Sequence, residues 1–277
     1  MNAGLTACSN GQAREKEQEI CQLVNRLSAM GIHTVQSRHL YAVDGVFSAS
    51  AKERAKDLMA FYEDPGIDVI YDISGGDIAN EILNALDYEV IQKSGKMFWG
   101  YSDLTTVINA VYAKTGMPSV LYQVKNLTKA CAKLQQQRFQ DALDGTGNGL
   151  YNIDYQFLQG SGMEGIVTGG NVRCLLKLAG TAFWPDMKGK ILLLEALGGE
   201  APQLAAYFAQ LDQMGVFADV CGVLLGTFTR FEQTQQDQTV YSLLRPHIRK
   251  DLPVAETPDI GHGPDAKAIV IGKYAGF

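Results

Sequence analysis

The sequence predicts an α/β protein of two domains, and three observations lead to this. The chain has 277 residues, more than one domain usually contains. Its first half alternates apolar strand-like runs with helical runs, an order typical of a parallel sheet covered by helices. A Gly/Asn cluster at 144–149 then leads into a half with more strand character. We expect domains at 1–145 and 146–277, the second smaller and richer in β-structure.

The elements of the first half follow from apolar spacing. Ile20, Leu23, Val24 and Leu27 recur at i, i+3, i+4 and i+7, which predicts a helix over 15–30. The same reasoning predicts strands at 4–8, 32–35, 67–73 and 96–99, and helices at 51–62, 78–86 and 104–113.

The second half follows a polar helix expected at 127–143, just before the domain boundary. Short strands are expected at 151–158, 165–168, 190–194, 220–225 and 268–271, with a helix at 202–214.

Composition excludes several classes of protein. The net charge is −6 and no run of Lys or Arg stands out, so nucleic acid is not an expected partner. No apolar stretch reaches the 18 or more residues of a membrane span. Residues 5–8 look like a lipoprotein cleavage site, but only seven residues precede Cys8 and none is basic. The five cysteines form no C-x-x-C pair, so we expect reduced thiols, no metal and a cytoplasmic protein.

Ser102 is the first candidate for chemistry. It lies in the segment Gly-Tyr-Ser-Asp at 100–103, between a predicted strand and a predicted helix. A sharp turn there exposes a serine hydroxyl beside helix N–H groups, and it would hold the serine in a strained backbone conformation. The alternative is that Ser102 or Asp103 simply caps the helix.

Ser74, Gly75 and Gly76 follow the strand predicted at 67–73. Paired glycines at the carboxyl end of a parallel strand let the backbone approach a ligand, and one N–H could serve an oxyanion hole. The alternative is a tight strand-to-helix turn without a function.

Glu195 and His262 are candidates for supporting such a serine. Glu195 ends an apolar strand and is followed by two glycines, and His262 is flanked by Gly261 and Gly263. The alternatives are a solvated strand end for Glu195 and an ordinary loop histidine for His262.

Eight segments together resemble the serine LD-carboxypeptidase family, which also contains the microcin C immunity peptidases. They occur in the family's order and span most of the chain. They lie at 74–76, 86–91, 100–105, 169–171, 180–181, 189–195, 226–228 and 260–262. One departure is that 121–126 replaces the family's His-Gly-Pro segment, which leaves substrate preference open.

The resemblance implies a Rossmann-like N-terminal domain, a smaller β-rich C-terminal domain and a site between them. It implies Ser102 as nucleophile, His262 as base and Glu195 as its partner. It also implies an oxyanion hole formed by the N–H groups of Gly76 and Asp103. Members of the family are often homodimers, and the resemblance implies no cofactor.

Three functions remain open. The first is release of a terminal D-alanine from a cytosolic murein tetrapeptide. The second is an immunity-type cleavage of an aminoacyl-nucleotide amide, in which Trp184 could stack on a base unless it is a core residue. The third is a two-domain ligand-binding protein without catalysis. In the first two, Ser74 and Gly75 are further candidates for substrate contact.

Overall fold

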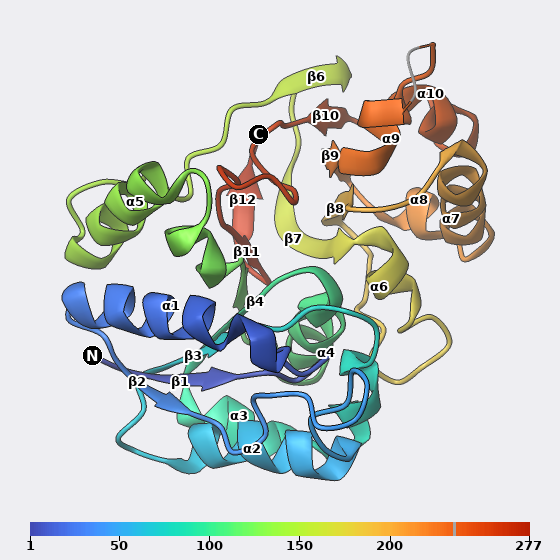
Figure 1. Cartoon of the computed structure of the whole chain (residues 1–277). Helices are drawn as coiled ribbons and strands as arrows, with labels where there is room; N and C mark the ends of the chain where they lie inside the picture. Colours follow the sequence, from blue (N-terminus) through green and yellow to red (C-terminus); the bar gives the residue numbers. More distant parts are fainter. Residues whose placement is uncertain (235–236) are drawn as a thin grey trace.

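The computed structural model describes residues 1–234 and 237–277, and within them the chain forms two six-stranded sheets with helices packed around them (Figure 1). The strands of the first sheet have the order β11-β5-β4-β3-β1-β2. They are β1 (Asn2–Thr6), β2 (His33–Gln36), β3 (Val69–Asp72), β4 (Met97–Gly100), β5 (Ser119–Leu121) and β11 (Ile269–Ile271). The first five are parallel to one another, and β11 is antiparallel to β5.

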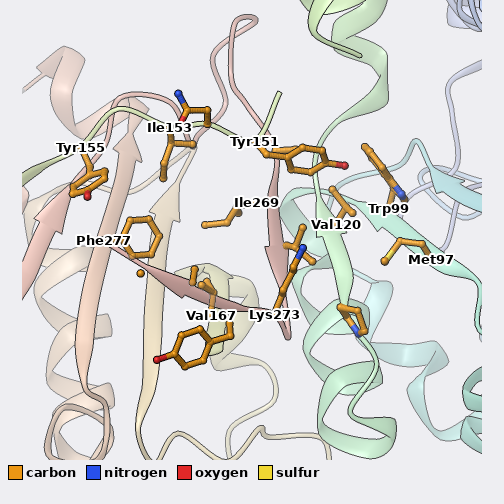
Figure 2. Close-up of a pocket in the computed structure, with 17 residues that line it drawn as sticks. Met97, Trp99, Val120, Tyr151, Ile153, Tyr155, Val167, Ile269, Lys273 and Phe277 are labelled. Carbon is orange, nitrogen blue, oxygen red and sulfur yellow. The ribbon is translucent and has the colours of Figure 1, made fainter. Parts of the chain in front are cut away.

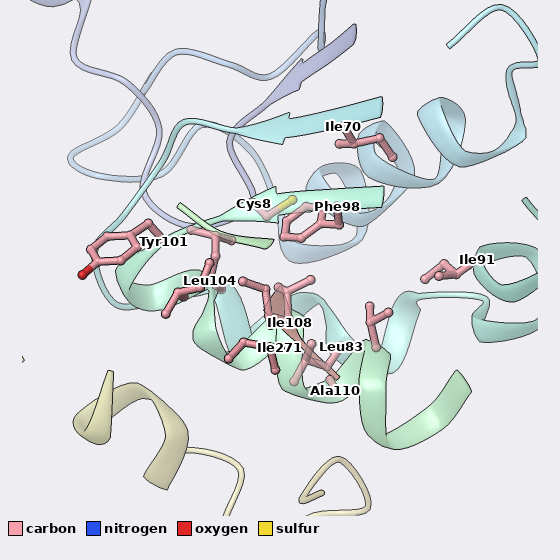
Figure 3. Close-up of a cluster of buried hydrophobic side chains, with 14 of the residues drawn as sticks. Cys8, Ile70, Leu83, Ile91, Phe98, Tyr101, Leu104, Ile108, Ala110 and Ile271 are labelled. Carbon is pink, nitrogen blue, oxygen red and sulfur yellow. The ribbon is translucent and has the colours of Figure 1, made fainter. Parts of the chain in front are cut away.

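Side chains alternate between the two faces of this sheet. In β3, Ile70 joins one apolar cluster, whereas Val69 and Tyr71 join the cluster on the other face. Figure 3 shows the first cluster, to which both Phe98 of β4 and Ile108 of the following helix belong. Both faces are therefore buried, as the predicted β-α-β-α order requires.

The helices of this half confirm most of the predicted elements. They are α1 (Glu17–Ala29), α2 (Ala51–Glu63), α3 (Tyr88–Ser94), α4 (Thr105–Thr115) and α5 (Ala132–Asp144). Short 3₁₀ helices are η1 (Arg14–Lys16), η2 (Ala79–Ala85), η3 (Ser102–Leu104) and η4 (Val124–Thr128). The helix expected at 78–86 is thus a 3₁₀ helix, and α3 and β5 were not predicted.

The second sheet has the order β12-β7-β8-β9-β10-β6. Its strands are β6 (Gln156–Gln159), β7 (Glu164–Asn171), β8 (Lys190–Ala196), β9 (Gly222–Phe228), β10 (Val254–Glu256) and β12 (Tyr274–Gly276). Its helices are α6 (Val172–Leu176), α7 (Ala201–Gln213), α8 (Val216–Asp219), α9 (Thr229–Thr234), α10 (Val240–Leu244) and η5 (Arg245–His247). Strands β7, β8, β9 and β10 are parallel, while β6 and β12 are antiparallel edges. The predicted two-part α/β fold is confirmed.

The last strands connect the two halves. β11 pairs with β5 of the first sheet, and β12 pairs with β7 of the second only a few residues later. The boundary predicted at 145/146 therefore does not describe β11, which returns to the first sheet. A strand was expected at 268–271, but the sequence gave no sign of the sheet it joins, because its partner β5 lies far away in the chain.

Helix α4 contacts β7 across the two halves through buried polar groups. The side chain of Asn109 donates to the carbonyl oxygen of Gly169 and accepts from its N–H, both at 2.9 Å. The hydroxyl of Thr105 accepts from the N–H of Asn171 at 3.0 Å. Gly170 permits this approach, since a Cβ atom there would lie 2.8 Å from Thr105 Oγ1. These contacts place the carboxyl end of β7 beside the start of α4.

Across the described residues, no helix combines the length and apolar character that a membrane-spanning helix needs.

Candidate active site

Ser102 lies at the turn between β4 and α4 in a strained backbone conformation. Its φ of 57° is the only positive value among the non-glycine residues that the structure describes. Such a conformation costs on the order of 1–3 kcal/mol and persists where the surroundings enforce it. The predicted strain at Ser102 is confirmed.

The capping alternative for this serine is wrong. Neither η3 nor α4 has a side-chain cap at its N-terminus. The carboxylate of Asp103 instead accepts hydrogen bonds from distant segments, and the half-buried Ser102 lines a cavity.

Glu195 is fully buried within β8, so the alternative of a solvated strand end is also wrong. Its Oε2 atom lies 2.8 Å from Nδ1 of His262 and accepts from the hydroxyl of Tyr101 at 3.1 Å. Its Oε1 atom accepts from Nδ2 of Asn171 at 3.0 Å. A buried carboxylate needs such partners to offset the loss of water.

Tyr101 contacts both members of this pair. Its ring meets the imidazole of His262 edge-on, with centroids 4.8 Å apart. Burial, and then the charge of Glu195, raise the pKa of Tyr101, so its hydroxyl stays protonated and donates. Because Ser102 is the next residue, Tyr101 connects the turn at Ser102 to the Glu195–His262 pair.

His262 lies on a loop held close to β9. The N–H of Thr227 donates to the carbonyl oxygen of Ile260 at 2.8 Å, and a Cβ atom on Gly261 would overlap the Thr227 side chain. Both ring nitrogens of His262 are buried, and neither has a well-aligned hydrogen bond among the described residues, although Nδ1 lies 2.8 Å from Oε2 of Glu195. The expected hydrogen bond from Ser102 to His262 is therefore not formed, whereas the expected contact with Glu195 is. Hydrogen bonds of this kind often tighten only when substrate binds.

The turn after β3 brings Gly76 to the same cavity as Ser102. Gly76 has a φ of 127°, and a Cβ atom there would lie 2.2 Å from the side chain of Asn10, so only glycine fits. Among the turn, loop and side-chain contacts of residues 1–234 and 237–277, neither the Gly76 N–H nor the Asp103 N–H has a partner. Both groups are thus available to a developing oxyanion.

Ser74 and Gly75 stabilise this turn through hydrogen bonds on its buried side. The Ser74 hydroxyl has no exposed surface, donates to Asp72 at 2.5 Å and accepts from the N–H of Ser9 at 3.0 Å. The Gly75 carbonyl accepts from the N–H of Asn10 at 3.2 Å. The hydrogen bonds of Ser74 support the turn, and a buried side chain offers no surface to a substrate.

The cavity beside Ser102 has a volume of about 640 Å³. Polar and charged side chains from both halves line it, among them Asn171, Arg173 and Arg230. Trp184 is not among its lining residues; it is half-buried and packs against the apolar clusters of both domains. The core alternative for Trp184 therefore describes its position.

A larger cavity of about 940 Å³ lies elsewhere (Figure 2). Its walls are mainly apolar and include Trp99, Tyr151 and Phe277, and none of the three catalytic candidates lines it. The size of a cavity thus does not locate the site; the convergence of polar groups does.

Sequence reasoning missed Tyr101 and Asn171 as site residues. Both lie inside segments that carried the family resemblance, at 100–105 and 169–171. Their side chains were not singled out because their partner, Glu195, is far away in the sequence.

The sequence of 3–123 matches the LD-carboxypeptidase N-terminal domain, and 164–276 matches the LD-carboxypeptidase C-terminal domain. The chain belongs to the LD-carboxypeptidase family. It is therefore a serine-type carboxypeptidase, and the alternative of a non-catalytic binding protein is not supported.

Relatives with assigned names agree with this assignment. The chain is 24% identical over 264 residues to the murein tetrapeptide carboxypeptidase of Pseudomonas aeruginosa, covering 91% of this chain and 86% of that protein. It is 26% identical over 272 residues to the microcin C7 self-immunity protein MccF of Escherichia coli, covering 86% and 79%.

The fold is shared with two kinds of solved structure. MccF in complex with glutamyl sulfamoyl guanosine superposes with a TM-score of 0.89 at 22% identity, covering 99% of this chain and 92% of that one. The muramoyltetrapeptide carboxypeptidase of Oxalobacter formigenes gives a TM-score of 0.84 at 22% identity, covering 100% and 94%.

Proposed function

We propose that this enzyme uses Ser102, His262 and Glu195 to release the terminal D-alanine of a murein tetrapeptide. The observation that supports this most is the buried Glu195–His262 pair, linked through Tyr101 to a strained serine. Family membership and the relative that is named as a murein tetrapeptide carboxypeptidase indicate the substrate class.

The geometry supports a two-step acyl transfer. Nε2 of His262 accepts the proton of the Ser102 hydroxyl as Oγ attacks the carbonyl carbon before the terminal D-alanine. The carboxylate of Glu195 orients the imidazole and stabilises its protonated form. The N–H groups of Gly76 and Asp103 receive the oxyanion. His262 then gives the proton to the departing amine, and water hydrolyses the acyl-enzyme by the same route.

The test is release of D-alanine from L-Ala-γ-D-Glu-L-diamino acid-D-Ala. The variant Ser102→Ala should lower turnover by a factor on the order of 10⁶, because triad members act as a unit. Glu195→Gln should cost less, since the carboxylate only orients and supports His262. A peptide that ends in L-alanine is the matched control for specificity.

No metal is expected in this reaction. Among the described residues, no three His, Cys, Asp or Glu side chains gather as metal ligands would. A chelator should leave the rate of D-alanine release unchanged, and a loss that added Zn²⁺ restores would contradict the serine mechanism.

The second candidate is the immunity-type reaction, favoured by the similarity to MccF. The position of Trp184 outside the Ser102 cavity removes the base-stacking argument for it. Ser102-dependent cleavage of an aminoacyl sulfamoyl nucleoside, without D-alanine release, would make this reaction the function.

We further propose that the enzyme acts in the cytoplasm as a homodimer. All five cysteines are free, as expected in a reducing compartment. Tyr155 and Tyr274 are exposed at the rim of the 940 Å³ apolar cavity, a surface that a second copy could cover. Light scattering should give the mass of a dimer, and Tyr274→Glu should shift it toward the monomer.

A further inference from the structure

Two cations of the second domain lie beside the oxyanion hole of the first. Arg173 lies on α6, and Lys177 is the C-cap residue directly after this helix. Positions four residues apart lie on the same face of a helix, so both side chains can reach one target. That target is the turn at 75–77 and the residue after the nucleophile.

Arg173 holds the Gly76 side of the hole. Its guanidinium pairs with the carboxylate of Asp77 through Nη1, and Nη2 donates to the carbonyl oxygen of Gly76 at 3.2 Å. The hydrogen bond from Nη1 of Arg173 to the Asp77 carboxylate, together with the charge of Arg173, lowers the pKa of Asp77, so the pair stays ionised near neutral pH. The peptide that follows Gly76 is thus fixed from the second domain.

Lys177 contacts both sides of the hole. Its ammonium donates to the carbonyl oxygen of Asp77 at 2.8 Å and to Oδ1 of Asp103 at 2.5 Å. The Asp103 carboxylate is fully buried, whereas Lys177 keeps some exposed surface. Removing the cation would leave a buried carboxylate without its counter-charge, which is costly.

The other oxygen of Asp103 extends this network through the first domain. Oδ2 accepts from the hydroxyl of Ser9 at 2.6 Å and from the N–H of Ala79 at 2.8 Å. The carboxylate therefore joins the loop after β1, the segment after β3 and the nucleophile turn. Lys177 is the part of this network that comes from the second domain.

We propose that Arg173 and Lys177 are positioning residues that fix the orientation of the Gly76 and Asp103 N–H groups. This rests on the proposed serine mechanism and extends it. The second domain then supplies Glu195 and His262 and also sets the oxyanion hole of the first domain. The two cations contact the backbone and side chains around the oxyanion hole. Contact with the reacting atoms is assigned to Ser102, His262 and the two N–H groups.

Domain docking alone would be a different role for these cations. The contacts of Asn109 and Thr105 with β7 already join the domains through buried groups. Loss of Lys177 should therefore leave the domains docked and disturb the hole. This separates a positioning role from a structural one.

The experiment compares Lys177→Met, Lys177→Arg, Arg173→Gln and the control Lys188→Met, an exposed lysine of the same domain. Four quantities are measured: kcat and KM for D-alanine release, the rate at which a fluorophosphonate modifies Ser102, and Tm. The fluorophosphonate also needs the oxyanion hole, but it needs no murein peptide.

Removing a whole oxyanion donor costs about 10²–10³ in kcat, so a displaced donor should cost about 10- to 100-fold in Lys177→Met. The phosphonylation rate should fall in parallel, with KM changed by less than about twofold, as expected for an interaction made in the transition state. Lys177→Arg should recover most of the rate because it keeps the charge. Arg173→Gln should lose less, since its ion pair is more exposed, and Lys188→Met should match the wild type.

Two results would overturn the positioning role. One is that the fluorophosphonate modifies Ser102 in Lys177→Met as fast as it does in Lys188→Met. The other is a loss confined to KM. If the wild type reacts with the fluorophosphonate but releases no D-alanine, the proposed substrate is wrong, and the phosphonylation comparison still decides the role of Lys177. A wild type unreactive at Ser102 would reject both proposals.

Discussion

The hydroxyl of Tyr101 should be needed to hold Glu195, and Tyr101→Phe tests this with little other change. The phenylalanine keeps the ring that meets His262 at 4.8 Å. It removes the donor that lies 3.1 Å from Oε2 of Glu195. The buried carboxylate would then keep Asn171 and His262 as partners.

The size of the effect follows from the charge of the acceptor. A hydrogen bond to a charged group contributes about 1.5–3 kcal/mol, so the free energy of unfolding should fall by about that amount. If about 1.4 kcal/mol of this is also lost from the transition state, kcat falls about tenfold. The loss reflects a less well-oriented His262.

Tyr62→Phe is the matched control. The Tyr62 hydroxyl is buried and has no hydrogen-bond partner among the described residues, so its removal should be neutral or stabilising. Urea unfolding and D-alanine release are measured for both variants. If Tyr101→Phe stays within about 0.5 kcal/mol of Tyr62→Phe and keeps wild-type kcat, Tyr101 does not hold Glu195 and the reasoning fails.

Three further predictions follow from other contacts. Gly76→Ala should lose most activity in a folded protein, because φ is 127° and the new Cβ atom would meet Asn10; circular dichroism and D-alanine release check this, and full activity would reject Gly76 as an oxyanion donor. Asn109→Leu should destabilise the protein by about 2 kcal/mol or more in urea, since it leaves the buried N–H and carbonyl of Gly169 without partners; an unchanged midpoint would contradict this. Burial raises the pKa of Tyr62, Tyr71 and Tyr122, so the unfolded chain releases phenolic protons first and stability should fall as pH rises above about 10; equal urea midpoints at pH 9 and pH 11 would refute it.

The sequence predicted the parts of the site that depend on local order. Ser102 was identified because a strand, a sharp turn and a helix follow one another within a few residues. Glu195 was identified because it ends a long apolar run, and His262 because glycines flank it. Each of these signals lies within one short segment and marks a candidate only; the roles of nucleophile, base and supporting carboxylate were implied by the family resemblance.

The remaining features depend on contacts between distant segments. Lys177 meets Asp103 and Arg173 meets Asp77 only because α6 follows β7 toward the first domain. The sequence left Trp184 open as a base-stacking residue or as a core or interface residue, and the packing of both domains around it decides for the latter. The three-residue strand β5 is too short for its periodicity to be recognised, and the strand expected at 268–271 gave no sign that it joins the first sheet.

The return of β11 to the first sheet also affects how the enzyme is made. On the ribosome, residues 1–123 emerge long before residues 269–271, so β5 leaves the tunnel as the unpaired edge of an unfinished sheet. An apolar edge of this kind can pair with other nascent chains until it is covered. We therefore expect chaperones to bind the growing polypeptide, and protection from hydrogen exchange of those β5 amides that face β11 to appear only after synthesis of the last strands.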